Sequence, residues 1–287
     1  MKKTGVIFLF LVWIAGNCPG AASYSYLNNP AGARPVGMAE AFAGMPGNIN
    51  GLYYNPASLF GLKTSVLNFS HAEFLPGVRY EYAGAAFILP GAVLGVSAAY
   101  VNNGTQERRD LNGVPAGEFT PYQFIPQVTL AAEMLNGLSL GFSFKMPYEV
   151  IDDYSDYKPF FDIGVNAGLG PQFYAGLSAQ NIGTFADAPA NLKAGLTYLG
   201  KELNLCLDLN IPYRGVSTIS LGLEILTLEK ITFRTGYRYK IGEANNTLEG
   251  LTAGFGVQFD ILSLDYGYKL YDELGATHFI SLAVRIN

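Results

Sequence analysis

The sequence has few charged residues and no long hydrophobic run beyond its N-terminal segment. Only 14% of its 287 residues are charged, whereas a soluble domain usually carries about 25%. The absence of an apolar run of about 20 residues excludes a helical membrane protein. The chain is instead rich in glycine (34 residues) and in aromatic side chains (14%). This combination is typical of a transmembrane β-barrel, whose outer face is apolar only at every second residue.

Cysteine and histidine are also scarce, with two residues of each. Because Cys18 lies in a segment that we expect to be removed, Cys206 remains alone and no internal disulfide is expected. We interpret His71 and His278, near the outer ends of the first and last expected strands, as residues of a membrane interface. No Cys and His cluster has metal-ligand spacing, and no glycine-rich loop precedes a helix to hold phosphate. The sequence therefore predicts no enzyme, cofactor, metal site or nucleic-acid partner.

The first 22 residues have the features of a secretory signal peptide. Lys2 and Lys3 precede an apolar run over residues 6–15, and small residues follow at 20–22. The apolar run is too short for a membrane anchor. Cleavage after Ala22 would change the formal net charge from −5 to −7, because both lysines leave with the signal. We therefore expect export to the outer membrane of a Gram-negative type of cell, with the barrel assembly machinery as a partner during biogenesis.

From Ser65 onward, apolar and polar residues alternate with a period of two. The stretch 203–209 is an example, because its four leucines interleave with Asn204, Cys206 and Asp208. Most segments of this kind are close to the 9–11 residues that a tilted membrane strand needs. About fourteen of them occur, at 65–71, 78–88, 92–101, 122–134, 138–146, 161–169, 173–180, 190–198, 203–211, 217–225, 231–239, 250–259, 262–269 and 277–286. The predicted fold is all-β, an antiparallel transmembrane barrel of about 14 strands.

The charged residues of these segments share the phase of Ser, Gly and Asn rather than that of the apolar set. A Lys or Arg facing lipid near mid-membrane costs about 2–4 kcal/mol, so we expect the charged set to face the interior. Arg79, Glu81, Arg234 and Arg238 are the candidate charged residues of the lumen. They either gate a path or form structural pairs with a segment inside the barrel, and the pattern does not separate the two roles.

Connection lengths distinguish a barrel from a soluble β-sandwich, in which the same alternation occurs. Short connections alternate with long ones, such as 102–121 and 147–160, as expected when all long loops lie on one side of a membrane. Tyrosines in the apolar phase cluster beside the long loops and predict an interfacial girdle. These are Tyr80, Tyr82, Tyr100, Tyr122, Tyr237, Tyr239, Tyr266 and Tyr268.

Residues 33–59 form the only long part of the mature chain without a strand pattern. Gly, Asn and Pro interrupt regular structure there, yet the segment contains several large apolar side chains that need burial. We expect residues 23–63 to fill the lumen as a hatch and residues 64–287 to form the barrel around it. Glycines at inward positions either let this hatch approach the wall or give the strands curvature. The candidate residues of the hatch and ligand path are Gly37, Met38, Phe42, Leu52, Asn55, Pro56 and Ala57.

Two motifs of this segment, ARPVGMAEAF (33–42) and GLYYNPASL (51–59), resemble the N-terminal signature of the PorV/PorQ family, a branch of the FadL-like outer-membrane barrels. The resemblance implies fourteen strands and an N-terminal hatch with an Asn-Pro-Ala element, which matches Asn55, Pro56 and Ala57. It continues through VRYEYAGAAF (78–87), LGVSAAYVNNG (94–104), GLSAQNIG (176–183), LTAGFGVQF (251–259), LSLDYGYK (262–269) and the C-terminal THFISLAVRIN.

The resemblance implies two alternative functions. FadL-like members admit hydrophobic small molecules across the outer membrane through a rearrangement of the hatch and a side opening in the wall. PorV-like members belong to the type IX secretion system and hold secreted proteins at the outer membrane. A structural barrel without cargo is a third interpretation. We expect passive, hatch-gated uptake, with outer-membrane lipid and either hydrophobic small molecules or secreted proteins as partners.

Overall fold

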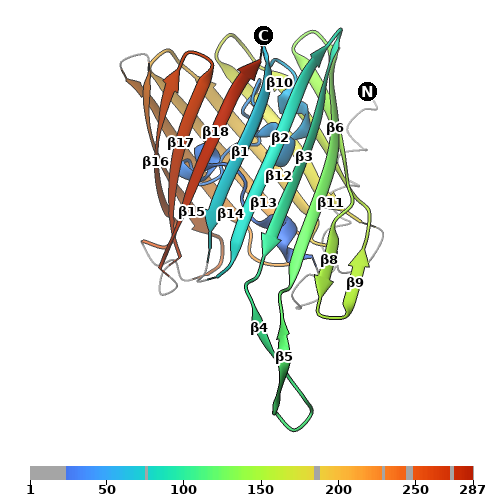
Figure 1. Cartoon of the computed structure of the whole chain (residues 1–287). Helices are drawn as coiled ribbons and strands as arrows, with labels where there is room; N and C mark the ends of the chain where they lie inside the picture. Colours follow the sequence, from blue (N-terminus) through green and yellow to red (C-terminus); the bar gives the residue numbers. More distant parts are fainter. Residues whose placement is uncertain are drawn as a thin grey trace.

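Antiparallel strands form a closed barrel (Figure 1). The computed structural model describes residues 24–74, 77–183, 188–227, 230–243, 248–271 and 275–286, so the expected signal peptide lies outside the described residues. The fourteen barrel strands in this part of the chain are β1 (Ser65–Glu73), β2 (Arg79–Leu89), β3 (Ala92–Asn102), β6 (Tyr122–Leu135), β7 (Leu138–Lys145), β10 (Phe160–Gly168), β11 (Phe173–Ile182), β12 (Asn191–Leu199), β13 (Leu203–Pro212), β14 (Thr218–Thr227), β15 (Ile231–Lys240), β16 (Leu251–Phe259), β17 (Leu262–Leu270) and β18 (Ala276–Ile286). The first strand pairs with the last from Ser65↔Ile286 to Glu73↔His278, which closes the ring. The prediction of an antiparallel barrel of about 14 strands is confirmed.

Two small hairpins extend two of the long connections. Strands β4 (Gln106–Arg109) and β5 (Pro115–Phe119) form a separate two-stranded sheet. Strands β8 (Tyr148–Ile151) and β9 (Tyr154–Tyr157) continue the barrel sheet from the outer end of β6. Figure 1 shows both hairpins projecting from the end of the barrel opposite the C-terminus. The sequence does not predict these strands, because they are short and lack a sustained alternation of apolar and polar residues.

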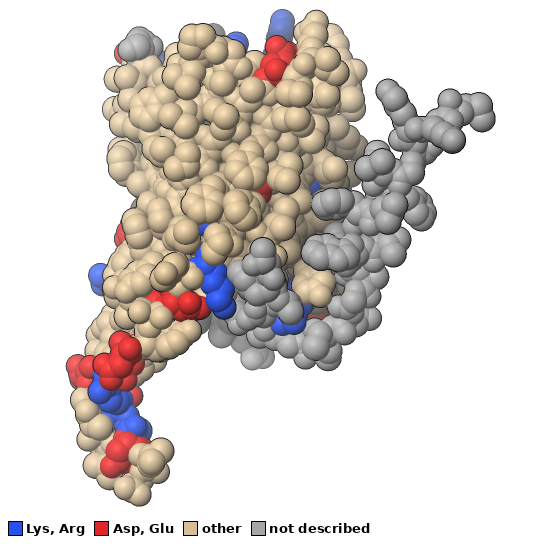
Figure 2. All heavy atoms as spheres, turned by 90° about the vertical axis from the view of Figure 1, so that its right-hand side faces the viewer, with Lys and Arg blue, Asp and Glu red and all other residues tan. Residues whose placement is uncertain are grey.

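The barrel wall has an apolar outer face and, on most of its strands, a polar inner face. Leu205 and Leu207 on β13 are exposed, whereas Cys206 and Asp208 between and beyond them are buried. On the face shown in Figure 2, charged side chains concentrate near the ends of the barrel and on the projecting hairpin, and the middle of the wall is almost free of them. The arrangement is the reverse of that in a soluble protein and suits contact with hydrocarbon.

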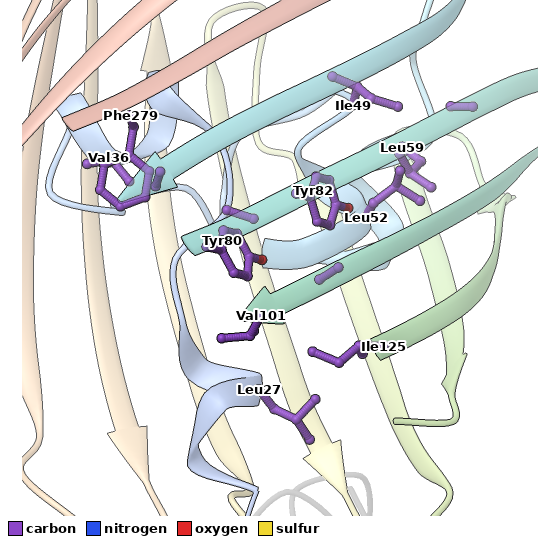
Figure 3. Packing of buried hydrophobic residues seen from close by; sticks show 14 of the residues in the cluster. Leu27, Val36, Ile49, Leu52, Leu59, Tyr80, Tyr82, Val101, Ile125 and Phe279 are labelled. Carbon is purple, nitrogen blue, oxygen red and sulfur yellow. The ribbon is translucent and has the colours of Figure 1, made fainter. Parts of the chain in front are cut away.

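The orientation predicted for the outer half of β2 is wrong. Tyr80 and Tyr82 are buried, at 2% and 5% exposure, and Figure 3 shows both rings on the inner side of the strand. Arg79 and Glu81 are exposed on the outer face and are therefore not lumen residues. Tyrosine is compatible with either face, since its ring packs in a core and its hydroxyl suits an interface. The two tyrosines consequently do not belong to an interfacial girdle.

The phase of β2 is set by packing against the interior. The inward set of this strand continues from the tyrosines to Gly84, where an added β-carbon would lie 2.8 Å from the Leu52 side chain. Tyr80, Tyr82 and Leu52 belong to one buried apolar cluster with Leu59 and Val101. Burying two aromatic rings against apolar partners is favoured by several kcal/mol. The two charged residues then lie on the outside near the long connections, and not at mid-wall.

Residues 24–62 lie inside the barrel, where they appear in blue in Figure 1. Their short helical turns are η1 (Ser25–Asn28), α2 (Ala33–Gly37), α3 (Gly51–Tyr54) and η2 (Pro56–Leu59). Asn55 caps η2, because its side chain accepts a hydrogen bond from Ala57 N. No helix in the described residues is both long enough and apolar enough to span a membrane. We call residues 24–62 the interior segment.

Candidate functional site

Inward-facing glycines bring the interior segment into backbone contact with the wall. A β-carbon added at Gly236 on β15 would lie 2.5 Å from Ala39 N, and one at Gly267 on β17 would lie 2.6 Å from Ala33 O. A β-carbon at Gly254 on β16 would lie 3.2 Å from Gly37 Cα. Other inward glycines contact the segment similarly, namely Gly141, Gly164, Gly176, Gly195 and Gly222. Of the two roles considered for these glycines, close approach to the wall accounts for their positions.

One ion network joins α2 to the wall on the side of the short connections. Arg34 donates two hydrogen bonds to Glu224 on β14, Nε to Oε2 at 2.9 Å and Nη2 to Oε1 at 2.8 Å. Arg234 on β15 donates from Nε to Glu224 Oε2 at 2.6 Å and from Nη1 to Asp265 Oδ1 at 2.7 Å. Glu224 is 2% exposed. A bidentate guanidinium–carboxylate pair of this kind is strong and directional. We call these four residues the first ion network.

A second ion network holds a strained turn on the side of the long connections. Arg238 Nη2 lies 2.8 Å from Glu40 Oε1 and also donates to Ala39 O at 2.9 Å. Lys269 Nζ donates to Glu40 Oε1 at 3.0 Å. Ala39 and Glu40 both have left-handed backbone, with φ of 52° and 61°, and such a conformation costs roughly 1–2 kcal/mol per residue. The network of Glu40, Arg238 and Lys269 offsets this cost.

Two cavities lie on opposite sides of the turn formed by residues 33–40. A cavity of about 960 Å³ at the end with the short connections is lined by members of the first ion network and by Asn48 and Arg285. A second cavity, of about 250 Å³, at the end with the long connections is lined by Ala39 and the cations of the second network, and by Tyr271. Residues of β15, β16 and β17 line both cavities. Residues 33–40 therefore stand between the two cavities, and we call them the partition.

The inward positions of β15 demonstrate this arrangement residue by residue. Arg234 lines the larger cavity, Gly236 contacts the partition, and Arg238 lines the smaller cavity. On β16, Thr252 Oγ1 accepts a hydrogen bond from Ala39 N at 3.0 Å and donates one to Gly37 O at 3.2 Å. Polar contacts thus hold the partition to β15 and β16, and Val36 adds apolar packing in one buried cluster with Phe279 of β18.

The partition continues into an apolar cluster. Met38 and Phe42, two of the residues singled out in the sequence, are at most 1% exposed and pack with Met45, Tyr54 and Cys206. Asp208 on β13 fixes the backbone here, because its Oδ2 accepts from Phe42 N and Ala43 N, both at 2.7 Å. Movement of the partition would therefore expose flexible methionine and aromatic surface, which adapts readily to apolar ligands.

Asn55, Pro56 and Ala57 contact the wall and line neither of these two cavities. Asn55 Nδ2 donates to Ala43 O at 2.7 Å and to Val165 O on β10 at 3.0 Å. Leu52, another residue selected from the sequence, packs against the β2–β3 wall at Gly84 and Gly95. These contacts anchor the end of the segment opposite the partition.

Arg34 and Glu40 are functional candidates that the sequence did not predict, although it predicted Arg238, which pairs with Glu40. It also predicted Arg234, which binds the same carboxylate of Glu224 as Arg34. The signal was present, because Arg34 and Glu40 are the only charged residues between positions 24 and 62. A lone charge in a segment that must be buried needs a partner in the wall. Within the described chain, no group of three or more His, Cys, Asp or Glu side chains is arranged to hold a metal ion.

The start of the interior segment contacts the β8–β9 hairpin. The Tyr24 hydroxyl donates a hydrogen bond to Asp156 Oδ2, and Lys158 Nζ lies 5.2 Å from the centre of the Tyr24 ring. The hydrogen bond from Tyr24 lowers the pKa of Asp156. Since this contact favours the ionised carboxylate, it stabilises the docked segment above the ordinary Asp pKa and is lost as the pH falls through the lowered value.

Replacing Tyr24 with Phe is expected to raise the pKa of Asp156 toward the ordinary value of about 3.9. The change removes the hydroxyl donor and retains the ring that packs 5.4 Å from Phe160. An NMR titration of the Asp156 carboxyl carbon in detergent micelles measures the shift. An unchanged pKa in Y24F would show that this hydrogen bond does not determine the titration.

The comparisons with known proteins concern the fold. No protein-family model matches the sequence, and no curated protein matches it by sequence. Among solved structures, the toluene transporter TbuX of Ralstonia pickettii has a TM-score of 0.64 at 12% identity, over 90% of this chain and 98% of that chain. The monoaromatic hydrocarbon channel CymD has a TM-score of 0.63 at 14% identity, over 89% and 97% of the two chains. A FadL homologue of Pseudomonas aeruginosa has a TM-score of 0.62 at 12% identity, over 89% and 98%. The chain therefore has a FadL-like barrel fold.

Proposed function

We propose that this protein is an outer-membrane barrel that admits hydrophobic small molecules and that the partition is its gate. In this proposal residues 1–22 direct export, residues 23–63 are the hatch and residues 64–287 are the barrel. The apolar outer face supports the membrane location, and the similarity in fold to hydrocarbon transporters supports the class of solute. The motifs at 33–42 and 51–59 are the basis for placing the chain near the PorV/PorQ branch.

The observation that carries the proposal is the position of the partition between two cavities on the same three strands. A solute entering from the long connections would reach the smaller cavity first. Displacement of residues 33–40 along the wall, past Gly236, Gly254 and Gly267, would then join the two cavities. The apolar cluster around Met38 and Phe42 would supply contact surface for the solute during this movement.

The ion networks suit a gate because they hold the partition in place without filling the path. Glu40 forms salt bridges with Arg238 and Lys269, and water can replace each of these contacts when the turn moves. The backbone strain at Ala39 and Glu40 would be relieved by the same movement. Arg238 therefore has a gating role in this proposal, and Arg234 holds the other end of the partition through Glu224.

Uptake of a lipophilic fluorescent probe into proteoliposomes tests the proposal. Proteoliposomes with wild-type protein are expected to take up the probe faster than empty liposomes. Glu40→Gln is expected to increase the uptake rate by about tenfold, because loss of a charged contact of about 1–2 kcal/mol favours the displaced turn. Glu40→Asp, which keeps the charge, is the matched control. Rates equal to those of empty liposomes would argue against uptake.

The secretion-linked alternative predicts instead that secreted proteins co-purify from native membranes, and the structural alternative predicts neither result.

A further inference from the structure

The outer face of β1, β2 and β3 has a hollow of about 430 Å³. Its floor consists of Ala83 and Ala98, which lie opposite each other in the β2–β3 ladder. Phe69, the ladder partner of Ala83 on β1, and Phe124 on β6 line its sides. Two methyl groups between large aromatic side chains leave a recess in this part of the apolar wall. A recess of this kind suits a hydrocarbon chain.

Charged side chains border this hollow on the side of the long connections. Two residues further along each strand toward the long connections, His71 on β1 pairs with Glu81 on β2, and their Nδ1 and Oε1 atoms are 2.7 Å apart. We call such a set of outward-facing ladder partners a row. Both side chains are about half exposed, at 47% and 51%. Tyr100 on β3 is the other ladder neighbour of Glu81. The hydrogen bond occupies one carboxylate oxygen, and Glu81 Oε2 makes no hydrogen bond to any residue in the described parts of the chain.

The next row toward the long connections is more polar still. It contains His278, Glu73, Arg79 and Asn102, which follow one another as ladder partners across β18, β1, β2 and β3. Glu73 and Arg79 face each other, yet neither forms an ion pair with the residues that the structure describes. The outer face therefore changes from charged to apolar over three rows, in the direction from the long connections to the middle of the wall. This gradient matches the gradient from headgroup to acyl chain in a lipid leaflet.

We propose that this surface binds one phospholipid with a phosphoethanolamine headgroup. An acyl chain occupies the hollow above Ala83 and Ala98, the ammonium group donates to Glu81 and Glu73, and the phosphate meets Arg79. With histidine counted as neutral, two carboxylates against one guanidinium favour a headgroup that carries an amine over a purely anionic headgroup. The proposal requires the membrane location proposed above and is independent of uptake.

Native mass spectrometry of the purified barrel tests the proposal. The protein is exchanged into detergent with equal amounts of phosphatidylethanolamine and phosphatidylglycerol of identical acyl chains. Wild-type protein is expected to retain one molecule of phosphatidylethanolamine in preference to phosphatidylglycerol. Glu81→Gln is expected to reduce this preference about tenfold, since it removes a charge-assisted hydrogen bond. Ala83→Leu fills the hollow and is expected to reduce retention of both lipids.

Controls separate lipid binding from damage to the barrel. Ala98→Leu fills the hollow from the neighbouring strand and is expected to give the result of Ala83→Leu. Ala253→Leu places the same side chain on the outer face of β16 and is expected to leave lipid retention unchanged. Folding of each variant is checked by the mobility of unheated protein in gels. Equal retention of the two lipids by wild-type protein, or equal losses in A83L and A253L, would overturn the proposal whether or not the barrel transports solutes.

Discussion

A disulfide between positions 33 and 281 is expected to reduce solute uptake to the level of empty liposomes. Ser281 Oγ on β18 lies 2.7 Å from Ala33 N, at the beginning of the partition. This contact places the two positions side by side, and we expect cysteines there to form the disulfide on oxidation. The bond would fix the partition to the wall, and the two cavities could not be joined. Uptake is measured in proteoliposomes before and after reduction of the same sample.

The reduced sample is the internal control, because uptake is expected to return when the bond is broken. The double variant Ala33→Cys/Ser281→Cys is made in a Cys206→Ser background, since Cys206 is a buried free thiol of the wall. Each single-cysteine variant controls for the substitutions themselves. Uptake that persists in the fully oxidised protein would show that the partition does not need to move away from β18, and the proposed gate would then be wrong.

Replacing Gly236 with Leu is expected to produce the opposite effect, a barrel that conducts ions continuously. A β-carbon at this position would lie 2.5 Å from both Ala39 N and Met38 C, which are both backbone atoms of the partition. Overpacking of this kind costs roughly 1–3 kcal/mol. If that cost is relieved by displacement of the partition, the open form gains about 5- to 150-fold in population. The larger cavity would then be continuous with the smaller one.

Conductance across a planar lipid bilayer measures this change. Wild-type protein is expected to be nearly silent, because the interior segment fills the lumen, and Gly236→Leu is expected to show steady current. Ala253→Leu is the matched control, since it adds the same side chain to the outer face of the adjacent strand β16. A silent Gly236→Leu variant that retains its fold would mean that displacement of residues 38 and 39 does not open a path.

Several properties of the fold follow directly from the order of residues. Strand number, strand length and the alternation of apolar and polar side chains are local features, so period-two patterns were sufficient to predict an antiparallel barrel of about 14 strands. The inward orientation of Arg234 and Arg238 followed from the same alternation, because each lies in a strand whose opposite set is plainly apolar. The need for a buried segment near the N-terminus was also visible, because apolar residues without a strand pattern require a shielded place.

The orientation of β2 shows where this reasoning fails. The strand alternates between charged residues and tyrosines near its outer end, and either set can face outward close to a membrane interface. The correct assignment depends on Leu52, which packs against Gly84 from inside the barrel. No local pattern in residues 78–88 contains that information. The β4–β5 and β8–β9 hairpins were missed for a related reason, since short strands on long connections have too few residues for a periodic signal.

The sequence by itself determined the barrel and the two faces of its wall, because both arise from alternation within single strands and from the preference of apolar side chains for hydrocarbon. Only the tertiary structure decided the partners of the interior segment. Arg34 and Glu224 are separated by 190 positions, and Glu40 and Lys269 by 229. Which of the inward charges they meet depends on strand register and on the depth of the segment in the lumen. These are collective properties of the closed ring, and they place the partition between the two cavities.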